Sequence, residues 1–409
     1  MADTTQLQQT LSRQAAETAA PAFAAPSAPE TAAPGPLAPQ PSAPVAPDAP
    51  IEAPAFAHPA PAEAPAVRTR VWYLDVLRVL AIFGVVLYHT AGGIAAVCAD
   101  GSAARAVCTA IAAWTFFCVP LLFMISGTLF LDPARTVTLR GICRKNVTRV
   151  AVAYVFWSAL YAVLTTLYAQ HGFSAAAVRE MFYQFAVGQY HLWFLYAIIG
   201  LYLITPLLRS FAGDEHLVRL FLALWAAFSL VLPYFSALPG MGWLGEITTK
   251  WHLDFVTGFT GYFVLGRWLC MRERPLWHGW AALGAGMACF ALAAAWPASA
   301  AAGGLYGGFL SPGAALAAAG LFLLLRAAWR KTPALSARRG WLLAQLSACS
   351  FGVYLVHDFT LILFRKAGLF TSPLPAGLWA PVCGALVFLV SFGIIKLARR
   401  VPFVRRWLT

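Results

Sequence analysis

The sequence predicts an all-α integral membrane protein with about ten transmembrane helices, both termini in the cytoplasm and a disordered N-terminal tail. Hydrophobic residues make up 60% of its 409 residues and charged residues only 11%, whereas a soluble domain carries about 25% charged residues. The apolar residues are concentrated in stretches long enough to cross a bilayer. Most Lys and Arg lie in the short segments between these stretches, which is the charge distribution expected of cytoplasmic loops.

Residues 1–66 differ in composition from the rest of the chain. They are rich in Ala and Pro and contain one basic residue, Arg13. Repeated Ala-Pro steps build neither a stable helix nor a packed core, so this stretch is predicted to be a disordered tail. We therefore divide the chain into a tail (1–66) and a membrane domain (67–409).

From Trp72 onward, ten stretches have the composition of a membrane span. Each is close to the ~17–25 residues that a helix needs to cross the hydrocarbon core. The expected spans are residues 72–95, 106–131, 147–169, 192–208, 217–236, 254–271, 277–296, 312–329, 341–364 and 378–398.

The distribution of basic residues orients these spans. An even number of spans places both termini on the same side of the membrane. The loops on that side contain 22 Lys and Arg residues, and the loops on the other side contain five. Because cytoplasmic loops carry the excess of basic residues, we expect cytoplasmic termini and a multi-pass location in the cell inner (plasma) membrane.

The first expected span carries two polar residues of catalytic type, Arg78 and His89. Eleven residues of helix rise about 16.5 Å and turn through about three turns plus 20°, so both side chains project from the same face. Arg78 alone is explained by snorkelling to the interface or by pairing with Asp75 one turn earlier. That explanation leaves His89 without a role. A functional polar track along this face is therefore the favoured interpretation.

Two further histidines are expected at the depth of His89. His191 opens the fourth span together with Trp193, and His357 lies near the outer end of the ninth. Intervals of three and four residues place one polar set of the ninth span on a single face: Ser347, Ser350, Tyr354 and His357. Singly, His191 and His357 are explained as solvated interfacial residues, but three histidines at one level indicate a reaction centre.

The second span and the loop after it hold candidate substrate-binding residues. Pro120 and the pair Ser126-Gly127 predict a kink that frees backbone groups, although close helix packing at Gly127 explains the same residues equally well. The loop carries a basic cluster: Arg135, Arg140, Arg144, Lys145 and Arg149. The positive-inside rule alone explains the cluster, but its arginines would also bind phosphates, for which Arg144 and Arg149 are the candidates.

The cysteines and the net charge limit the cofactors and partners to be expected. The eight cysteines show no CxxC and no Cys/His spacing of a metal site, so neither a metal nor a bound cofactor is expected. The loops explain the net charge of +13, which makes nucleic acid an unexpected partner. Cys98 and Cys108 flank the first outer loop and are predicted to form a disulfide if that loop lies outside the cytoplasm.

Five stretches occur in an order that resembles the acyltransferase-3 family of polytopic membrane acyltransferases: LDVLRVLAIFGVVLYH, PLLFMISGTLF, HLWFLYAIIGLYLITPLL, GYFVLG and SFGVYLVH. The likeness covers roughly residues 72–398. HLWFL and SFGVYLVH are most similar to bacterial members that O-acetylate surface polysaccharides, such as enterobacterial common antigen. The family's arginine–ten residues–histidine motif matches Arg78 and His89, and its FFxISG-like motif matches Phe123 to Gly127.

One family motif is altered. The arginine pair three residues apart falls on Asn146 and Arg149, so only Arg149 matches and Arg144 and Lys145 are candidate substitutes. The resemblance otherwise covers the motifs in order along the membrane domain.

The resemblance implies an O-acyltransferase. The donor substrate would be cytoplasmic acetyl-CoA, and the acceptor would be a hydroxyl of a surface polysaccharide or lipid-linked glycan on the outer side. His89 would act as general base or as a transiently acetylated nucleophile. Arg78 would orient the donor or stabilise developing negative charge. The residues assigned to substrate binding are Ser126, Arg144, Arg149, His191, Trp193, Tyr354 and His357.

Two other functions fit the same residues. A transporter of an anionic or lipid-linked substrate would use Arg78 and His89 as a substrate and proton site. Inverted internal repeats would favour a transporter, and none is evident in the sequence. A membrane scaffold that recruits partners through its tail predicts that His89 is dispensable.

Overall fold

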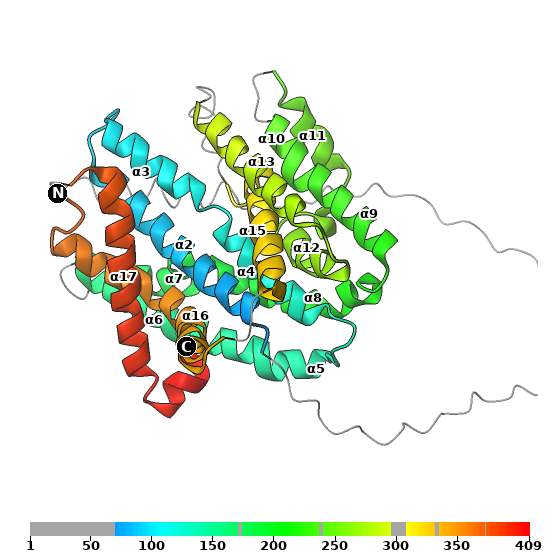
Figure 1. The fold of residues 1–409 in the computed structure, drawn as a ribbon. Helices are drawn as coiled ribbons and strands as arrows, with labels where there is room; N and C mark the ends of the chain where they lie inside the picture. The colour runs from blue at the N-terminus through cyan, green and yellow to red at the C-terminus, as the bar shows by residue number, and fades with distance from the viewer. Residues whose placement is uncertain (1–69, 171–173, 237–239, 296–307, 332–334, 373) are drawn as a thin grey trace, which may run out of the picture. The chain divides into compact units, whose positions relative to one another are not determined.

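The structure is a computed structural model that describes residues 70–170, 174–236, 240–295, 308–331, 335–372 and 374–409. The predicted tail, 1–66, lies outside these ranges. Residues Val71–Thr409 form one compact unit. Every regular element described in this unit is helical (Figure 1).

Helices follow one another along the unit with short connections. Five 3₁₀ or π segments among the described residues interrupt, join or follow them: η1 (Cys143–Val147), η2 (Tyr190–Leu192), η3 (Ala226–Val231), η4 (Asp254–Val256) and η6 (Val404–Leu408). The α-helices are α2 (Trp72–Val97), α3 (Ala103–Trp114), α4 (Cys118–Phe130), α5 (Leu139–Ile142), α6 (Thr148–Gln170), α7 (Ala175–Val187), α8 (Trp193–Phe211), α9 (Glu215–Trp225), α10 (Leu232–Ser236), α11 (Trp243–Lys250), α12 (Thr260–Met271), α13 (Leu276–Ala295), α15 (Pro312–Lys331), α16 (Ala337–Lys366) and α17 (Ala376–Ala398).

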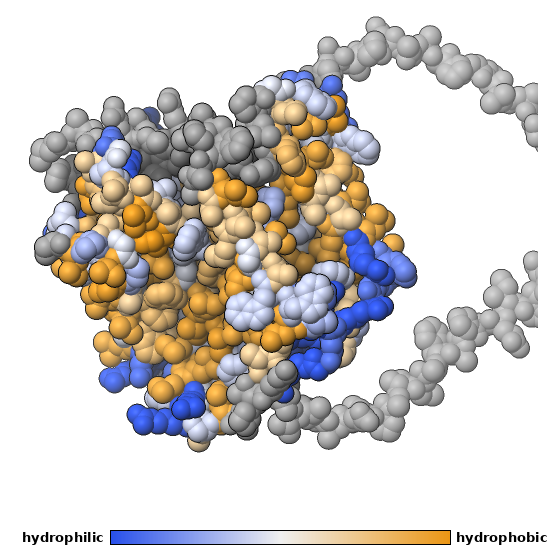
Figure 2. Space-filling model, turned by 45° about the horizontal axis from the view of Figure 1, so that its top comes forward, coloured by the Kyte–Doolittle hydropathy of each residue, from blue (hydrophilic) through white to orange (hydrophobic). Residues whose placement is uncertain are grey.

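Seven helical segments among the described residues are long and apolar enough to cross a membrane: Trp72–Val97, Ala103–Phe130, Leu139–Thr166, Ala175–Phe211, Pro312–Arg330, Ala337–Lys366 and Ala376–Ala398. In Figure 2, hydrophobic side chains (orange) cover most of the middle of the visible face, and hydrophilic side chains (blue) gather at its lower edge, its right side and its top. The described part of the chain is therefore all-helical, and the protein is a multi-pass membrane protein.

Three of the ten predicted spans are not among these seven: 217–236, 254–271 and 277–296. The extent predicted for 254–271 is wrong, because Gly258 has a φ of 69° and α12 begins only at Thr260. The 12 residues of α12 rise about 18 Å, less than the ~30 Å hydrocarbon core. The stretch 217–236 is helical through α9, η3 and α10, while α13 is apolar over Leu276–Leu292.

The second predicted span is broken near its proline. α3 ends at Trp114, and α4 begins at Cys118 after a short turn. Pro120 lies in the first turn of α4, where its missing N–H costs no helical hydrogen bond. α4 continues through Ser126 and Gly127 without interruption, so the Ser-Gly pair does not kink the helix.

Gly127 instead allows α4 to approach α12 closely. A Cβ at Gly127 would lie 1.7 Å from the carbonyl oxygen of Phe263. A Cβ at Gly266 would lie 2.0 Å from the carbonyl oxygen of Met124. The two helices therefore pack backbone against backbone, as small residues permit in membrane bundles.

α2 lies in the core, where Leu77, Ala81 and Val86 are fully buried. It contacts α3, α4, α15, α16 and α17 (Figure 1). Arg78 of α2 binds Ser347 of α16, and His89 of α2 meets His357 of α16. The partner numbers rise together along both helices, so α2 and α16 run parallel and in register.

Cys98 and Cys108 are both free thiols, so the predicted disulfide is not formed. Cys98 directly follows the end of α2. Cys108 is buried within α3 rather than placed in the connecting loop.

Candidate active site

Three histidines from distant parts of the chain meet in one cluster. His89 comes from α2, His191 from η2 (Tyr190–Leu192) and His357 from α16. The ring centroid of His357 lies 5.2 Å from that of His89 and 5.1 Å from that of His191. His191 and His357 are buried, whereas His89 is half-buried. The structure thus brings together the histidines that the sequence places at one depth.

Tyr354 supports this histidine cluster. Nδ1 of His357 lies 2.6 Å from the carbonyl oxygen of Tyr354. The buried hydroxyl of Tyr354 donates a hydrogen bond to the carbonyl oxygen of His191. Tyr354 therefore joins α16 to η2 and fixes the relative positions of two of the three histidines.

A buried carboxylate, Asp358, holds the segment that faces His89. The hydroxyl of Tyr190 donates to Asp358 Oδ1 at 2.7 Å, and Nε2 of Gln189 donates to Oδ2 at 3.1 Å. Nδ1 of His191 is 3.9 Å from the same Oδ2, which is too long for a hydrogen bond. The ring of Tyr190 lies edge-on to that of His89, with centroids 5.2 Å apart. Asp358 thus positions a side chain that contacts the candidate base.

Three nitrogen atoms of the cluster have no hydrogen-bond partner among the described residues. They are Nδ1 and Nε2 of His191 and Nε2 of His357. A buried polar atom without a partner costs about 1–3 kcal/mol, and folded proteins contain few of them. A polar substrate placed between these rings and His89 would satisfy the unpaired atoms. The cluster is therefore suited to hydrogen bonding and proton transfer with a bound ligand.

Aromatic rings border the cluster beside His89. Tyr88 lies 4.8 Å from His89 and 5.7 Å from Phe309, measured between ring centroids. Trp193 lies 6.0 Å from Phe309 and 5.0 Å from Phe259. Trp193 is thus connected to His89 through Phe309 and Tyr88, as part of an aromatic wall.

Arg78 lies at the other end of the same face of α2, about 16.5 Å of helix away from His89. Its Nη1 donates to Oγ of Ser347 at 3.0 Å and lies 3.4 Å from Oδ1 of Asp75. Ser347 in turn donates to Asp75. Arg78 is therefore paired with Asp75, as the snorkelling explanation expects, and is also bound to the helix that carries His357.

Other predicted residues gather around Arg78. The charges of Arg78 and Arg399 both act on Arg149. Tyr202 of α8 lies near Arg78, Arg149 and Ser126. The structure therefore brings the cations Arg78 and Arg149 together, with Ser126 nearby, at the end of α2 remote from the histidines. These two arginines are called the cationic group below.

Arg149 and Arg144 have different environments. The guanidinium group of Arg149 donates to the backbone carbonyl of Thr409 and lies 5.7 Å from the ring centroid of Phe351. Arg144 lies in the π-helical turn η1, and its side chain is exposed. Of the two phosphate candidates, only Arg149 belongs to the cationic group around Arg78.

A separate polar pocket of about 250 Å³ lies beside the start of α2. Its charged lining residues are Asp132, Arg135, Arg267 and Arg326. Arg326 also donates to the carbonyl oxygen of Arg272 at 3.0 Å, and Nε of Arg267 donates to that of Ala212 at 3.3 Å. These arginines therefore hydrogen-bond backbone carbonyls at helix C-termini as well as lining the pocket. The described residues contain no group of side chains suited to holding a metal ion.

The fold and the histidine cluster define a multi-pass membrane protein with polar chemistry built into its helical core. The profile of the acyltransferase-3 family, described as an acyltransferase domain, matches residues 71–396. The chain belongs to this family, which confirms the resemblance seen in the sequence motifs, and it is accordingly a membrane acyltransferase with an acyl donor and an acceptor. No curated protein and no solved structure matches the chain.

Proposed function

We propose that the protein transfers an acetyl group from cytoplasmic acetyl-CoA to a hydroxyl of a surface polysaccharide or lipid-linked glycan, and that it does so in the inner membrane. The proposal is carried by the histidine cluster, whose unpaired nitrogens lie beside His89 on the helical face that also carries Arg78. Family membership supplies the acyl-transfer chemistry. Beyond family membership, we propose acetyl as the acyl group, coenzyme A as its carrier and a glycan hydroxyl as the acceptor.

In the proposed reaction, His89 removes the proton of the acceptor hydroxyl while the hydroxyl oxygen attacks the carbonyl carbon of the thioester. The new C–O bond forms, the C–S bond breaks, and the departing thiolate receives the proton from His89. An imidazole suits both steps, because its ordinary pKa of about 6.5 lets it accept and return a proton near neutral pH. A covalent acetyl-His89 intermediate would make and break the same bonds in two steps.

His89 is the histidine of the cluster best placed for this role, because it is half-buried whereas the other two are buried. His191 and His357 would hydrogen-bond the acceptor through nitrogens that otherwise lack a partner. Asp358 would act as a positioning residue, since it holds Tyr190 against the ring of His89.

The distance between Arg78 and His89 favours donor orientation over charge stabilisation as the role of Arg78. A separation of about 16.5 Å along the helix is too long for both side chains to contact the same reacting atoms. An elongated donor such as acetyl-CoA carries its phosphates and its thioester at opposite ends. Its phosphates would bind Arg78 and Arg149 beside Ser126, and its thioester would reach His89. A phosphate oxygen would then replace the carbonyl of Thr409 as the acceptor for Arg149.

Acetyl-CoA turnover by the purified protein tests the proposal. We expect release of the CoA thiol, with acetyl groups recovered by mass analysis in glycans of cells that contain the protein. Loss of a positioned base costs about 10²–10⁴ in rate, so His89→Ala should nearly abolish turnover. His216→Ala is the matched control, because His216 is an exposed histidine of α9.

The alternatives give different results. Full activity of His89→Ala would contradict the catalytic assignment. Absence of turnover combined with movement of an anionic substrate across vesicles would identify a transporter instead.

A further inference from the structure

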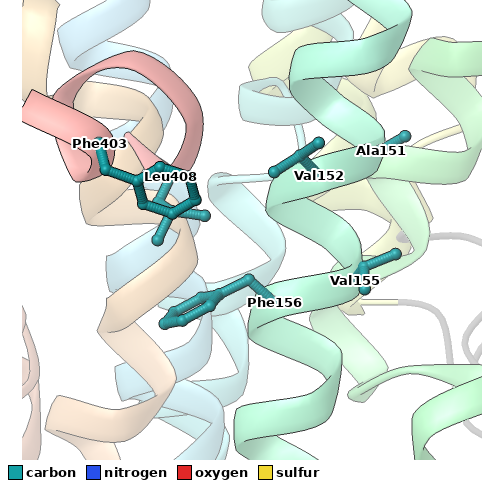
Figure 3. Close-up of a pocket in the computed structure, with 6 residues that line it drawn as sticks. All are labelled: Ala151, Val152, Val155, Phe156, Phe403 and Leu408. Carbon is teal, nitrogen blue, oxygen red and sulfur yellow. The ribbon is translucent and has the colours of Figure 1, made fainter.

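An apolar groove of about 380 Å³ lies between α6 and the C-terminal segment η6 (Val404–Leu408). It is lined by Ala151, Val152, Val155, Phe156, Phe403 and Leu408. Figure 3 shows Phe403 and Leu408 on one side and the α6 side chains on the other. Val155, Phe156 and Phe403 are exposed, so the groove opens to the surroundings of the helix bundle. Its lining offers contact to hydrocarbon and no hydrogen bond.

Basic residues flank the groove-lining residues in the sequence. Arg405 and Arg406 of η6 are exposed, and so are Arg144 and Lys145 at the start of the α6 segment. No Asp or Glu occurs in residues 133–179 or 359–409, so the two segments that form the groove carry a net positive charge. The guanidinium carbon of Arg406 lies 5.1 Å from the ring centroid of Trp407. Arginine and tryptophan together are typical of the membrane–water interface.

We propose that this groove is a binding site for one anionic phospholipid. An acyl chain would lie along Val155, Phe156 and Phe403, and the phosphate would bind Arg405 and Arg406. Charge complementarity selects this occupant, because the phosphate of a zwitterionic lipid is already compensated by its own ammonium group, whereas an anionic lipid brings the net negative charge that Arg405 and Arg406 attract. The inference is independent of the acyl-transfer reaction proposed above.

The bound lipid would stabilise η6 against α6. Leu408 lines the groove, and its carbonyl oxygen accepts a hydrogen bond from Nε1 of Trp157 at 3.2 Å. The adjacent Thr409 is buried and accepts from Arg149, while Nη1 of Arg399 donates to its Oγ1 at 3.1 Å. Filling the groove would therefore hold a segment that also fixes the guanidinium group of Arg149.

Native mass spectrometry of the full-length protein in detergent tests the site, with dioleoyl phosphatidylglycerol and dioleoyl phosphatidylcholine as probes. The wild type should retain the anionic lipid in preference to the zwitterionic one. Arg405→Gln with Arg406→Gln should lower occupancy by the anionic lipid about tenfold or more. Arg338→Gln with Arg339→Gln is the matched control, because this adjacent exposed pair lies at the start of α16.

A second variant tests the groove without changing the charge. Val152→Phe adds a ring to the groove and should reduce retention of both lipids, while both arginines remain. Equal binding of the two lipids by the wild type would overturn the proposal, as would equal losses in the two arginine double variants. Lipid binding unchanged in Val152→Phe but accompanied by loss of a dimer would show that a second copy of the chain occupies the groove.

Discussion

At the residue scale, Nη1 of Arg78 makes one contact within α2 and one to α16. It donates to Ser347 and lies beside Asp75, and a planar guanidinium group can hold both while facing a phosphate. Arg78→Lys keeps the charge but loses this fork, so acetyl transfer should fall about tenfold or more, in line with the ~1.5–3 kcal/mol of a charged hydrogen bond.

The variant is compared with the wild type by acetyl transferred at matched membrane abundance, with Arg338→Lys as a control for exposed arginines. Full activity in Arg78→Lys would restore the snorkelling explanation, because lysine snorkels as well as arginine.

Variants of Arg149 and Arg267 distinguish two candidate binding sites for the donor phosphates. Arg149 belongs to the cationic group around Arg78, whereas Arg267 lines the polar pocket beside the start of α2. Arg149→Gln should raise the KM for acetyl-CoA with little change in kcat, because it removes binding shared by the ground and transition states. Arg267→Gln should leave that KM unchanged. The opposite pattern in steady-state kinetics would move the phosphates to the pocket.

Helical spacing predicted that Arg78 and His89 share a face, because this relation is local in the sequence. The contacts that complete the site are not local. Tyr202 meets Ser126 from another helix, and Arg149 binds Thr409, which follows it by 260 residues. Asp358 directly follows His357 in the sequence, yet nothing in its spacing shows that it binds Tyr190. Such pairings depend on which helices pack together.

At the scale of the elements, the crossing of α4 and α12 depends on Gly127. An added Cβ would lie 1.7 Å from the carbonyl oxygen of Phe263, and the backbone of α12 would have to move. Gly127→Ala should therefore lower the free energy of unfolding by about 1–3 kcal/mol, the usual cost of overpacking. Gly200→Ala is the control, since nothing lies within 4 Å of a Cβ at that helical glycine.

Thermal unfolding of both variants in detergent measures the difference. Equal unfolding temperatures would show that α4 and α12 do not require this close approach.

Hydropathy predicted the long, regular spans well and the short helix poorly. α2, α16 and α17 match expected spans because each is a continuous apolar helix of 23 residues or more. The stretch 254–271 has similar composition, but the positive φ of Gly258 breaks it before α12 begins. This 12-residue helix is apolar because it is buried against α4 inside the protein, and not because it faces lipid along a full membrane span. Composition alone does not distinguish the two causes.

At the scale of the whole helical unit, polarity is arranged along one direction. α2 and α16 run parallel, with Arg78 and Ser347 at one end and His89 and His357 at the other. A donor bound by cations at one end and an acceptor bound near the histidines at the other would meet within the core. The proposed reaction thus requires that the two ends face opposite sides of the membrane.

Reporter fusions test this requirement. With ten spans, fusions after residues 105, 179 and 250 should be extracytoplasmic and fusions after 140 and 274 cytoplasmic, because cytoplasmic loops would then hold 22 basic residues against five. A cytoplasmic signal at 179 would put the histidine cluster on the wrong side for a surface acceptor.

The reporter signal at residue 250 decides the number of spans. If only the seven long apolar segments crossed, once each, α2 and α16 would be the first and sixth crossings and would run antiparallel. They run parallel, so an odd number of further crossings lies between them. With α13 as the one further crossing, residues 250 and 274 lie on the same side and the chain has eight spans. An extracytoplasmic signal at 250 together with a cytoplasmic signal at 274 would show that the chain also crosses within 217–236 and 254–271, with the short α12 inserted through its contact with α4.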